Sequence, residues 1–146
     1  MFLAHNKTHE KFYLLSRNMK ASWTNSRPIC KSYDMDVLFL ETEAEADYFL
    51  NQCRLNHFHF EDCTLIGGMT LVPKAVEHWY WVTNGEQIDY QIKFAVGEPN
   101  HYDNKEFCLG LTKYSATQFF LFNDIFCNNY NEIFKFLCYK IAPIDW

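Results

Sequence analysis

The sequence has 146 residues, of which 18% are aromatic, and this length and composition suit one domain with a packed core. Its formal net charge of −5, without a run of Lys or Arg, argues against nucleic-acid or anionic-lipid partners. No apolar run approaches the roughly 18 residues of a membrane span, and the first ten residues turn polar too early for a signal-peptide core. We expect one domain over residues 1–146, either cytosolic or secreted with its signal peptide already removed.

The first predicted elements are a strand and a helix. Residues 11–15, KFYLL, are rich in strand formers. A short helix is predicted over residues 23–34, with Pro28 in its first turn, where a missing N–H costs little.

Residues 37–53, VLFLETEAEADYFLNQC, predict a short strand that runs into a second helix. Thr42 and Glu45 have the spacing of a capping box. Four residues that follow, at i, i+3, i+4 and i+7, would form one apolar face: Ala46, Phe49, Leu50 and Cys53.

After Cys63 the chain changes to short runs of β-branched and aromatic residues that Gly, Asn and Asp interrupt. Within them, Asn84-Gly85 indicates a hairpin, because both positions tolerate positive φ. Trp79 and Trp81 are expected in the core. Helices first and antiparallel strands afterwards predict an α+β domain.

The six cysteines are even in number and include no CxxC pair, which favours disulfides over free thiols or a zinc site. Disulfides and the tripeptide NKT at Asn6, an N-glycosylation pattern, both agree with secretion. A zinc site formed by His57, His59 and Glu61 is disfavoured, because alternating His and Phe is typical of a loop or strand edge.

Five oxygen-bearing side chains stand out in the C-terminal half: Glu98, Asn100, Glu106, Asn123 and Asp124. Hard oxygen donors are the ligands that Ca²⁺ prefers. Cys108 and Cys127 lie just past the two groups, so a disulfide between them would hold both groups together with a Cα separation of about 5.5 Å. The chemistry alone leaves open that these are solvated turn residues.

The spacing of these residues resembles the sugar site of the C-type lectin domain in its mannose-type form. The matching features are Glu98-Pro99-Asn100, Glu106 two residues before a cysteine, and Asn123-Asp124 just before another. The resemblance extends from residue 11 to about residue 140 and includes LIGG and the tryptophan-rich WYWVTNGEQIDY. The compact domain with an extra cysteine pair resembles secreted invertebrate or insect lectins of defence or recognition.

The resemblance implies a double-looped α+β fold with a carbohydrate-recognition domain over about residues 11–140. It implies the disulfides Cys30–Cys138 and Cys108–Cys127, which leaves Cys53 to pair with Cys63. The implied metal ligands are Glu98, Asn100, Glu106, Asn123 and Asp124, and the bond before Pro99 is expected to be cis.

The sequence departs from the family pattern at four positions. Phe122 and Leu65 stand where the family usually has tryptophan, and these exchanges affect packing more than chemistry. His101 and Phe107 stand where an accessory calcium site needs carboxylates, so we expect a single Ca²⁺.

The resemblance implies a secreted, calcium-dependent lectin for glycans of the mannose, glucose, N-acetylglucosamine or fucose type. Glu98, Asn100, Glu106 and Asn123 would contact the sugar as well as the metal. A single site binds weakly, so a homo- or hetero-oligomer is expected, and a role in innate immune or cell-surface recognition follows from the family. The alternative is a protein-binding or heteromeric module with a structural Ca²⁺. No Ser or free Cys lies in a sequence motif typical of a catalytic nucleophile, so we do not expect an enzyme.

Overall fold

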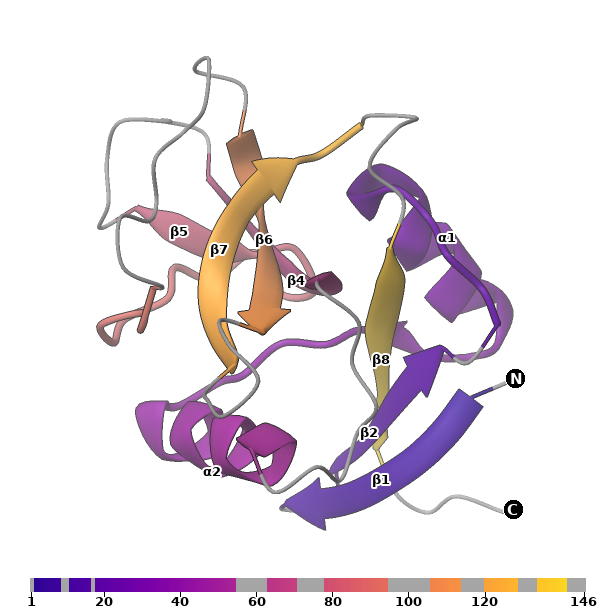
Figure 1. The fold of residues 1–146 in the computed structure, drawn as a ribbon, viewed down its shortest axis with the longest axis horizontal. Helices are drawn as coiled ribbons and strands as arrows, with labels where there is room; N and C mark the ends of the chain where they lie inside the picture. Colours follow the sequence, from indigo (N-terminus) through magenta and orange to yellow (C-terminus); the bar gives the residue numbers. More distant parts are fainter. Residues whose placement is uncertain are drawn as a thin grey trace.

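The structure is a computed structural model that describes residues 2–8, 11–16, 18–54, 63–70, 78–94, 106–113, 120–128 and 134–141. At residues 2–8, 53, 54, 63, 106, 113, 120 and 121 it describes the backbone alone. The elements in chain order (Figure 1) are β1 (Phe2–Thr8), β2 (Lys11–Ser16), α1 (Trp23–Ser32), β3 (Asp36–Val37), α2 (Glu43–Arg54), β4 (Cys63–Thr70), β5 (Trp79–Trp81), β6 (Glu106–Lys113), β7 (Phe120–Phe126) and β8 (Lys135–Ile141).

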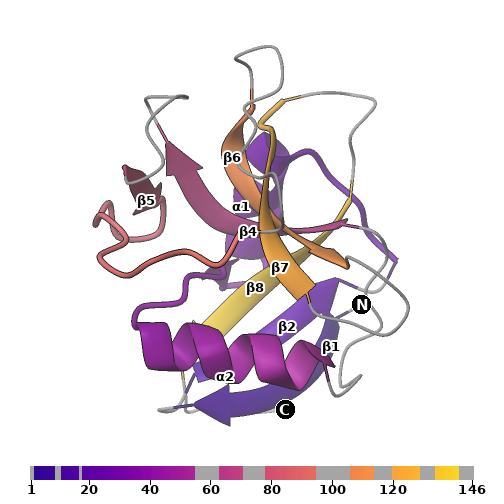
Figure 2. The same ribbon diagram turned by 60° about the vertical axis from the view of Figure 1, so that its left-hand side comes forward.

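The described strands form one sheet with the order β1-β2-β8-β4-β6-β7, in which β3 also pairs with β8 and β5 with β4. The β4–β8 pair is parallel, and the other pairs are antiparallel. The two helices lie on opposite sides of β8 (Figures 1 and 2). This arrangement confirms the α+β prediction, but β1 was not predicted, because its polar residues resemble a terminal arm.

Helix α2 begins as the capping-box spacing predicts. The N–H of Glu45 donates to Thr42 Oγ1 at 3.1 Å, while the Glu45 carboxylate accepts the N–H of Glu41 at 2.7 Å. The first bond is the one that the capping box predicts, whereas the carboxylate bonds the N–H of Glu41, one residue before Thr42. Ala46 and Phe49 on the predicted apolar face are 3% and 0% exposed.

Helix α1 ends at Ser32, two residues before the predicted end, and Tyr33 and Asp34 form the turn that follows. The prediction for Pro28 was wrong, because Pro28 lies inside the helix rather than in its first turn. A proline there removes one i to i−4 hydrogen bond. Packing supports the helix instead, since Cys30 is fully buried and Trp23 Nε1 donates to the carbonyl of Ile66 at 2.7 Å.

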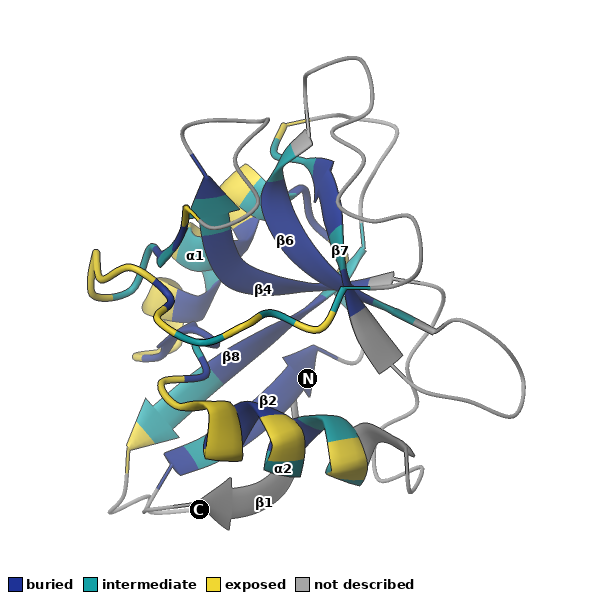
Figure 3. Cartoon of the chain, turned by 90° about the vertical axis from the view of Figure 1, so that its left-hand side faces the viewer, coloured by how far each residue is buried: buried dark blue, intermediate teal, exposed yellow. Residues whose placement is uncertain are grey.

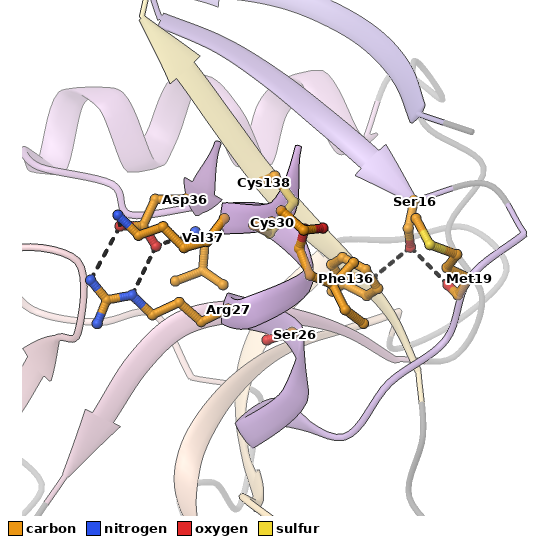
Figure 4. Close-up of a disulfide and its surroundings, with 12 residues drawn as sticks. Ser16, Met19, Ser26, Arg27, Cys30, Asp36, Val37, Phe136 and Cys138 are labelled. Atoms are coloured by element: carbon orange, nitrogen blue, oxygen red, sulfur yellow. Dashed lines mark hydrogen bonds and ion pairs between the residues drawn. A yellow bond between two sulfur atoms is a disulfide. The ribbon is translucent and has the colours of Figure 1, made fainter. Parts of the chain in front are cut away.

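The two ends of the domain are joined by β2 and β8 and by a disulfide (Figure 4). Cys30 in α1 is bonded to Cys138 in β8 with a Cα–Cα distance of 5.8 Å, as the resemblance implied. Ser16 Oγ accepts the N–H of Phe136 at 3.0 Å, which adds a polar bridge between the same two strands.

The turn after β5 forms where Asn84-Gly85 predicted one. Of these two residues, Gly85 alone has positive φ, at 73°, and its N–H donates to the carbonyl of Trp81. Asn84 Oδ1 accepts the N–H of Glu86 at 2.9 Å, so the asparagine acts through its side chain. The returning segment makes one isolated bridge, between Tyr80 and Gln87, and not a full second strand.

Two clusters of buried hydrophobic side chains form the core, one that includes residues of α2 and one that includes Cys30 of α1. The described side chains of β4, β6 and β7 are mostly buried (Figure 3). Trp79 and Trp81 are 1% and 3% exposed, as predicted. Phe122 and Leu65, the two positions where the family usually has tryptophan, are each 1% exposed. Both smaller side chains therefore remain fully packed in the core.

Candidate functional site

The predicted calcium ligands fall partly inside the described structure. Glu98, Pro99 and Asn100 lie outside the described residues, so the ligand geometry and the peptide bond of the first group stay predictions. Glu106 is the first residue of β6, where the backbone alone is described. Asn123 and Asp124 lie in the middle of β7 with described side chains.

The pairing of β6 with β7 sets the position of the second group. Gly110 pairs with Asn123, Leu109 pairs with Asp124, and Glu106 pairs with Phe126. The register shifts between Glu106 and Cys108. Glu106 and the Asn123-Asp124 pair therefore belong to one two-stranded unit.

A disulfide and helix α1 fix the end of this unit. Cys108 in β6 is bonded to Cys127, just after β7, and their Cα atoms are 5.3 Å apart, close to the separation expected for such a bridge. The carbonyl of Cys127 accepts hydrogen bonds from the N–H and the Oγ1 of Thr24, at 2.9 and 2.8 Å. Three elements thus hold the same short segment.

The segment that carries the first group begins and ends against β7. Phe94, the last described residue before it, forms a parallel bridge with Phe122, and the N–H of Phe122 donates to the carbonyl of Lys93 at 3.0 Å. The segment ends at Glu106, which also pairs with β7. The described residues that flank positions 95–105, Phe94 and Glu106, therefore both pair with the strand that carries Asn123.

The Asn123 carboxamide has one satisfied end and one unsatisfied end. Its Nδ2 donates to Thr112 Oγ1 at 3.3 Å. Its Oδ1 is buried and has no hydrogen-bond partner among the described residues. The neighbouring Asp124 is 0% exposed. A buried carboxamide oxygen without a donor is the kind of atom that a hard cation satisfies, so this donor set fits Ca²⁺.

Thr112 was not predicted as part of the site. A signal existed, because alternation along β6 places Thr112 on one face with Gly110, the residue opposite Asn123. The sequence alone could not supply the register that makes this pairing. Among the described residues, no three His, Cys, Asp or Glu side chains gather as a metal cluster.

A separate cleft of about 420 Å³ lies between the start of α2 and the turn after β5. Its lining includes Trp81, Tyr90 and four exposed acidic residues, Glu41, Glu43, Glu86 and Asp89. Neither Asn123 nor Asp124, the two predicted calcium ligands with described side chains, lines this cleft.

Comparison with known proteins identifies the fold. No protein-family model matches the chain. Human C-type lectin domain family 4 member C is 25% identical over 116 residues, which are 80% of this chain and about half, 49%, of that relative. The C-type lectin domain of murine dendritic cell inhibitory receptor 2, solved with an N-glycan, superposes with a TM-score of 0.73 at 19% identity, covering 94% of this chain and 95% of that chain. The chain has the fold of a C-type lectin-like domain.

A third similar structure is the EPNH mutant of the lectin CEL-I from Cucumaria echinata. It has a TM-score of 0.67 and 21% identity, and the match covers 93% of this chain and 92% of that chain. The sequence EPNH, after which that mutant is named, is also the sequence of residues 98–101 in this chain.

Other predictions fall partly outside the described side chains of this C-type lectin-like domain. Cys53 is the second-to-last residue of α2, and Cys63 is the first residue of β4. Only their backbones are described, so their pairing stays a prediction. Asn6 lies in β1 where the register shifts between His5 and Lys7. Neither described helix has the length and apolar composition of a membrane span.

Proposed function

We propose that this domain is a calcium-dependent lectin for glycans of the mannose, glucose, N-acetylglucosamine or fucose type. The proposed metal ligands are Glu98, Asn100, Glu106, Asn123 and Asp124. The observation that carries the proposal is the buried Oδ1 of Asn123, which has no hydrogen-bond partner among the described residues. Leaving such an acceptor unsatisfied costs about 1–3 kcal/mol, and a cation at this position removes the cost.

Chain geometry supports bringing the two ligand groups together. Glu98 is four residues from Phe94, so its Cα lies at most about 14 Å from that of Phe94. Phe94 pairs with Phe122, which precedes Asn123. Glu106 pairs with the same strand. The short tether allows Glu98 and Asn100 to reach the cation that Asn123 would hold.

Bound Ca²⁺ supplies coordination positions for two neighbouring hydroxyl groups of a hexose. The protein's own side chains add direction to this contact. The carboxylates of Glu98 and Glu106 accept the hydroxyl protons, and the amides of Asn100 and Asn123 donate to the remaining lone pairs. The order acid, proline, amide in residues 98–100 resembles the family form associated with mannose rather than galactose.

The same proposal includes secretion and clustering. The disulfides Cys30–Cys138 and Cys108–Cys127 suit an oxidising compartment. A shallow contact with two hydroxyl groups gives weak binding at one site, so useful avidity needs several domains on one assembly. The domain acts by binding, and residues 11–140 form the carbohydrate-recognition unit.

The test exchanges donors and acceptors in the first group. The double variant Glu98→Gln with Asn100→Asp keeps the net charge and the oxygen atoms but reverses the polarity that a mannose-type diol meets. We expect binding to immobilised mannan to fall by about 10-fold or more while Ca²⁺ binding persists. Unchanged mannan binding would exclude a sugar-reading role for this segment.

A matched control makes the same two exchanges elsewhere. Asn84→Asp with Glu86→Gln alters an exposed turn after β5 without changing the net charge. Mannan binding should stay at the wild-type value in this variant. If a Ca²⁺-loaded wild-type domain bound no glycan at all, the alternative of a protein-binding module with structural calcium would be supported instead.

A further inference from the structure

Strands β6 and β7 bring a threonine and the candidate ligand Asn123 side by side. Gly110 pairs with Asn123 and Thr112 pairs with Leu121, so Thr112 is the diagonal neighbour of Asn123 on the same face. Asn123 Nδ2 donates to Thr112 Oγ1 at 3.3 Å. Both side chains are half-buried.

A carboxamide presents oxygen on one side and N–H groups on the other, and a rotation of 180° exchanges them. The contact with Thr112 occupies the nitrogen side, which leaves Oδ1 on the other side, buried and without a partner among the described residues. A cation attracts the oxygen and repels the N–H dipoles. A cation on the open side of this carboxamide would therefore meet the oxygen and not the N–H groups.

We propose that Thr112 is a positioning residue that holds the Asn123 carboxamide with Oδ1 presented to the bound Ca²⁺. This inference rests on the proposed calcium-dependent function. Thr112 contacts neither the metal nor the glycan and acts only through Asn123. An amide has two N–H groups, and because Thr112 accepts one, the second stays available for a glycan hydroxyl.

The effect on the metal follows from pre-organisation. Without the Thr112 hydroxyl, the carboxamide samples both orientations, and Ca²⁺ must first select one. Removing an outer partner of a metal ligand typically weakens metal affinity by about 10- to 100-fold. We expect the lower end of that range, because four other proposed ligands remain.

The test compares two substitutions at one position by calorimetric Ca²⁺ titration. Thr112→Val removes the hydroxyl at nearly constant volume and should weaken Ca²⁺ binding by about 10-fold. Thr112→Ser keeps the hydroxyl and should restore affinity to within about 3-fold of wild type. Equal affinity in the wild type and Thr112→Val would overturn the inference while the proposed function stands.

A control separates positioning from general stability. Thr70 in β4 is buried, and its Oγ1 donates to the carbonyl of His78 at 2.7 Å. Thr70→Val also removes a threonine hydroxyl from the sheet, so it should lower the urea midpoint and leave Ca²⁺ affinity unchanged. Equal losses of Ca²⁺ affinity in Thr70→Val and Thr112→Val would contradict a positioning role.

A second measurement uses no glycan and no metal. In the calcium-free wild type, the two protons of the Asn123 side-chain amide should be separated more widely in a ¹⁵N-correlated NMR spectrum than those of an exposed asparagine, because Thr112 Oγ1 accepts one of them. Thr112→Ala should reduce this separation to that of an exposed asparagine, and unchanged signals would overturn the inference even if Thr112→Val failed to fold. A wild type that binds no Ca²⁺ would refute the proposed function, and this inference with it.

Discussion

Lys11 Nζ lies 3.2 Å from Glu45 Oε1, and the two residues are only 5% and 7% exposed. Glu45 also accepts the hydroxyl of Tyr13 at 3.2 Å and the N–H of Glu41 at 2.7 Å. Lys11 Nζ further donates to the carbonyl of Phe39. One buried ion pair therefore joins β2 to the start of α2.

Breaking this pair should be costly. Glu45→Gln leaves the Lys11 charge buried without its counter-charge, and the free energy of unfolding should fall by about 3 kcal/mol or more in urea titration. Glu86→Gln removes an exposed carboxylate and should change it by less than about 0.5 kcal/mol. Similar small losses in both variants would mean that the Lys11 site is hydrated.

Stability should fall in alkali because of Tyr90. Burial, followed by the nearby carboxylates of Glu45 and Asp89, raises the pKa of Tyr90 above its ordinary value of 10.0. Above pH 10 the unfolded chain releases this proton while the folded chain keeps it. Unfolding then releases protons, so the stability that Tyr90 contributes is present below pH 10 and is lost as the pH rises further.

The variant Tyr90→Phe isolates this effect. Phenylalanine removes the hydrogen bond to the carbonyl of Leu40 and lowers stability at neutral pH. Burial lowers the pKa of Lys11 and gives a slope of opposite sign below 10.5, but both proteins share it. Urea titrations between pH 9.5 and 11 should show a shallower decline in Tyr90→Phe, and parallel declines would contradict the assignment.

The two described disulfides should differ in how much they stabilise. Cys30–Cys138 spans 108 residues and Cys108–Cys127 spans 19. On the chain-entropy model the longer loop is worth about 5 kcal/mol and the shorter about 3 kcal/mol. Replacing each pair by alanine should therefore lower the melting temperature more for the first pair, and equal shifts would contradict this ranking.

The native protein should carry no free thiol. Cys53 and Cys63 are expected to form the third bridge, since an even cysteine set in a secreted domain is normally fully paired. Mass measurement after alkylation without reduction should show no added label. Two labels located on Cys53 and Cys63 would show that these residues do not form a third disulfide.

The fold could be predicted from the sequence where local signals and tertiary packing agree. Thr42 and Glu45 cap α2 as their spacing indicates, and the capping interaction is local. The predicted position of Pro28 in the first turn of α1 was wrong, because burial of Cys30 and the Trp23 contact with Ile66 outweigh one lost helical hydrogen bond. Strand β1 escaped prediction because its pairing with β2, and not its composition, makes it a strand.

The candidate site divides in the same way. The residue types and their spacing point to a metal-binding chemistry through Asn123 and Asp124, but they do not show which neighbours orient these side chains. The antiparallel register of β6 and β7 supplies that neighbour, Thr112, from a position eleven residues away. The register between two strands depends on tertiary packing, so it cannot be predicted from local sequence patterns alone.

The central claim is that bound calcium is required for glycan recognition. The most direct measurement is binding to immobilised mannan in Ca²⁺, in excess chelator and after Ca²⁺ is restored, combined with calorimetric Ca²⁺ stoichiometry. We expect one Ca²⁺ per chain, and we expect mannan binding to disappear in chelator and to return when Ca²⁺ is restored. Mannan binding that persists undiminished in excess chelator would contradict it.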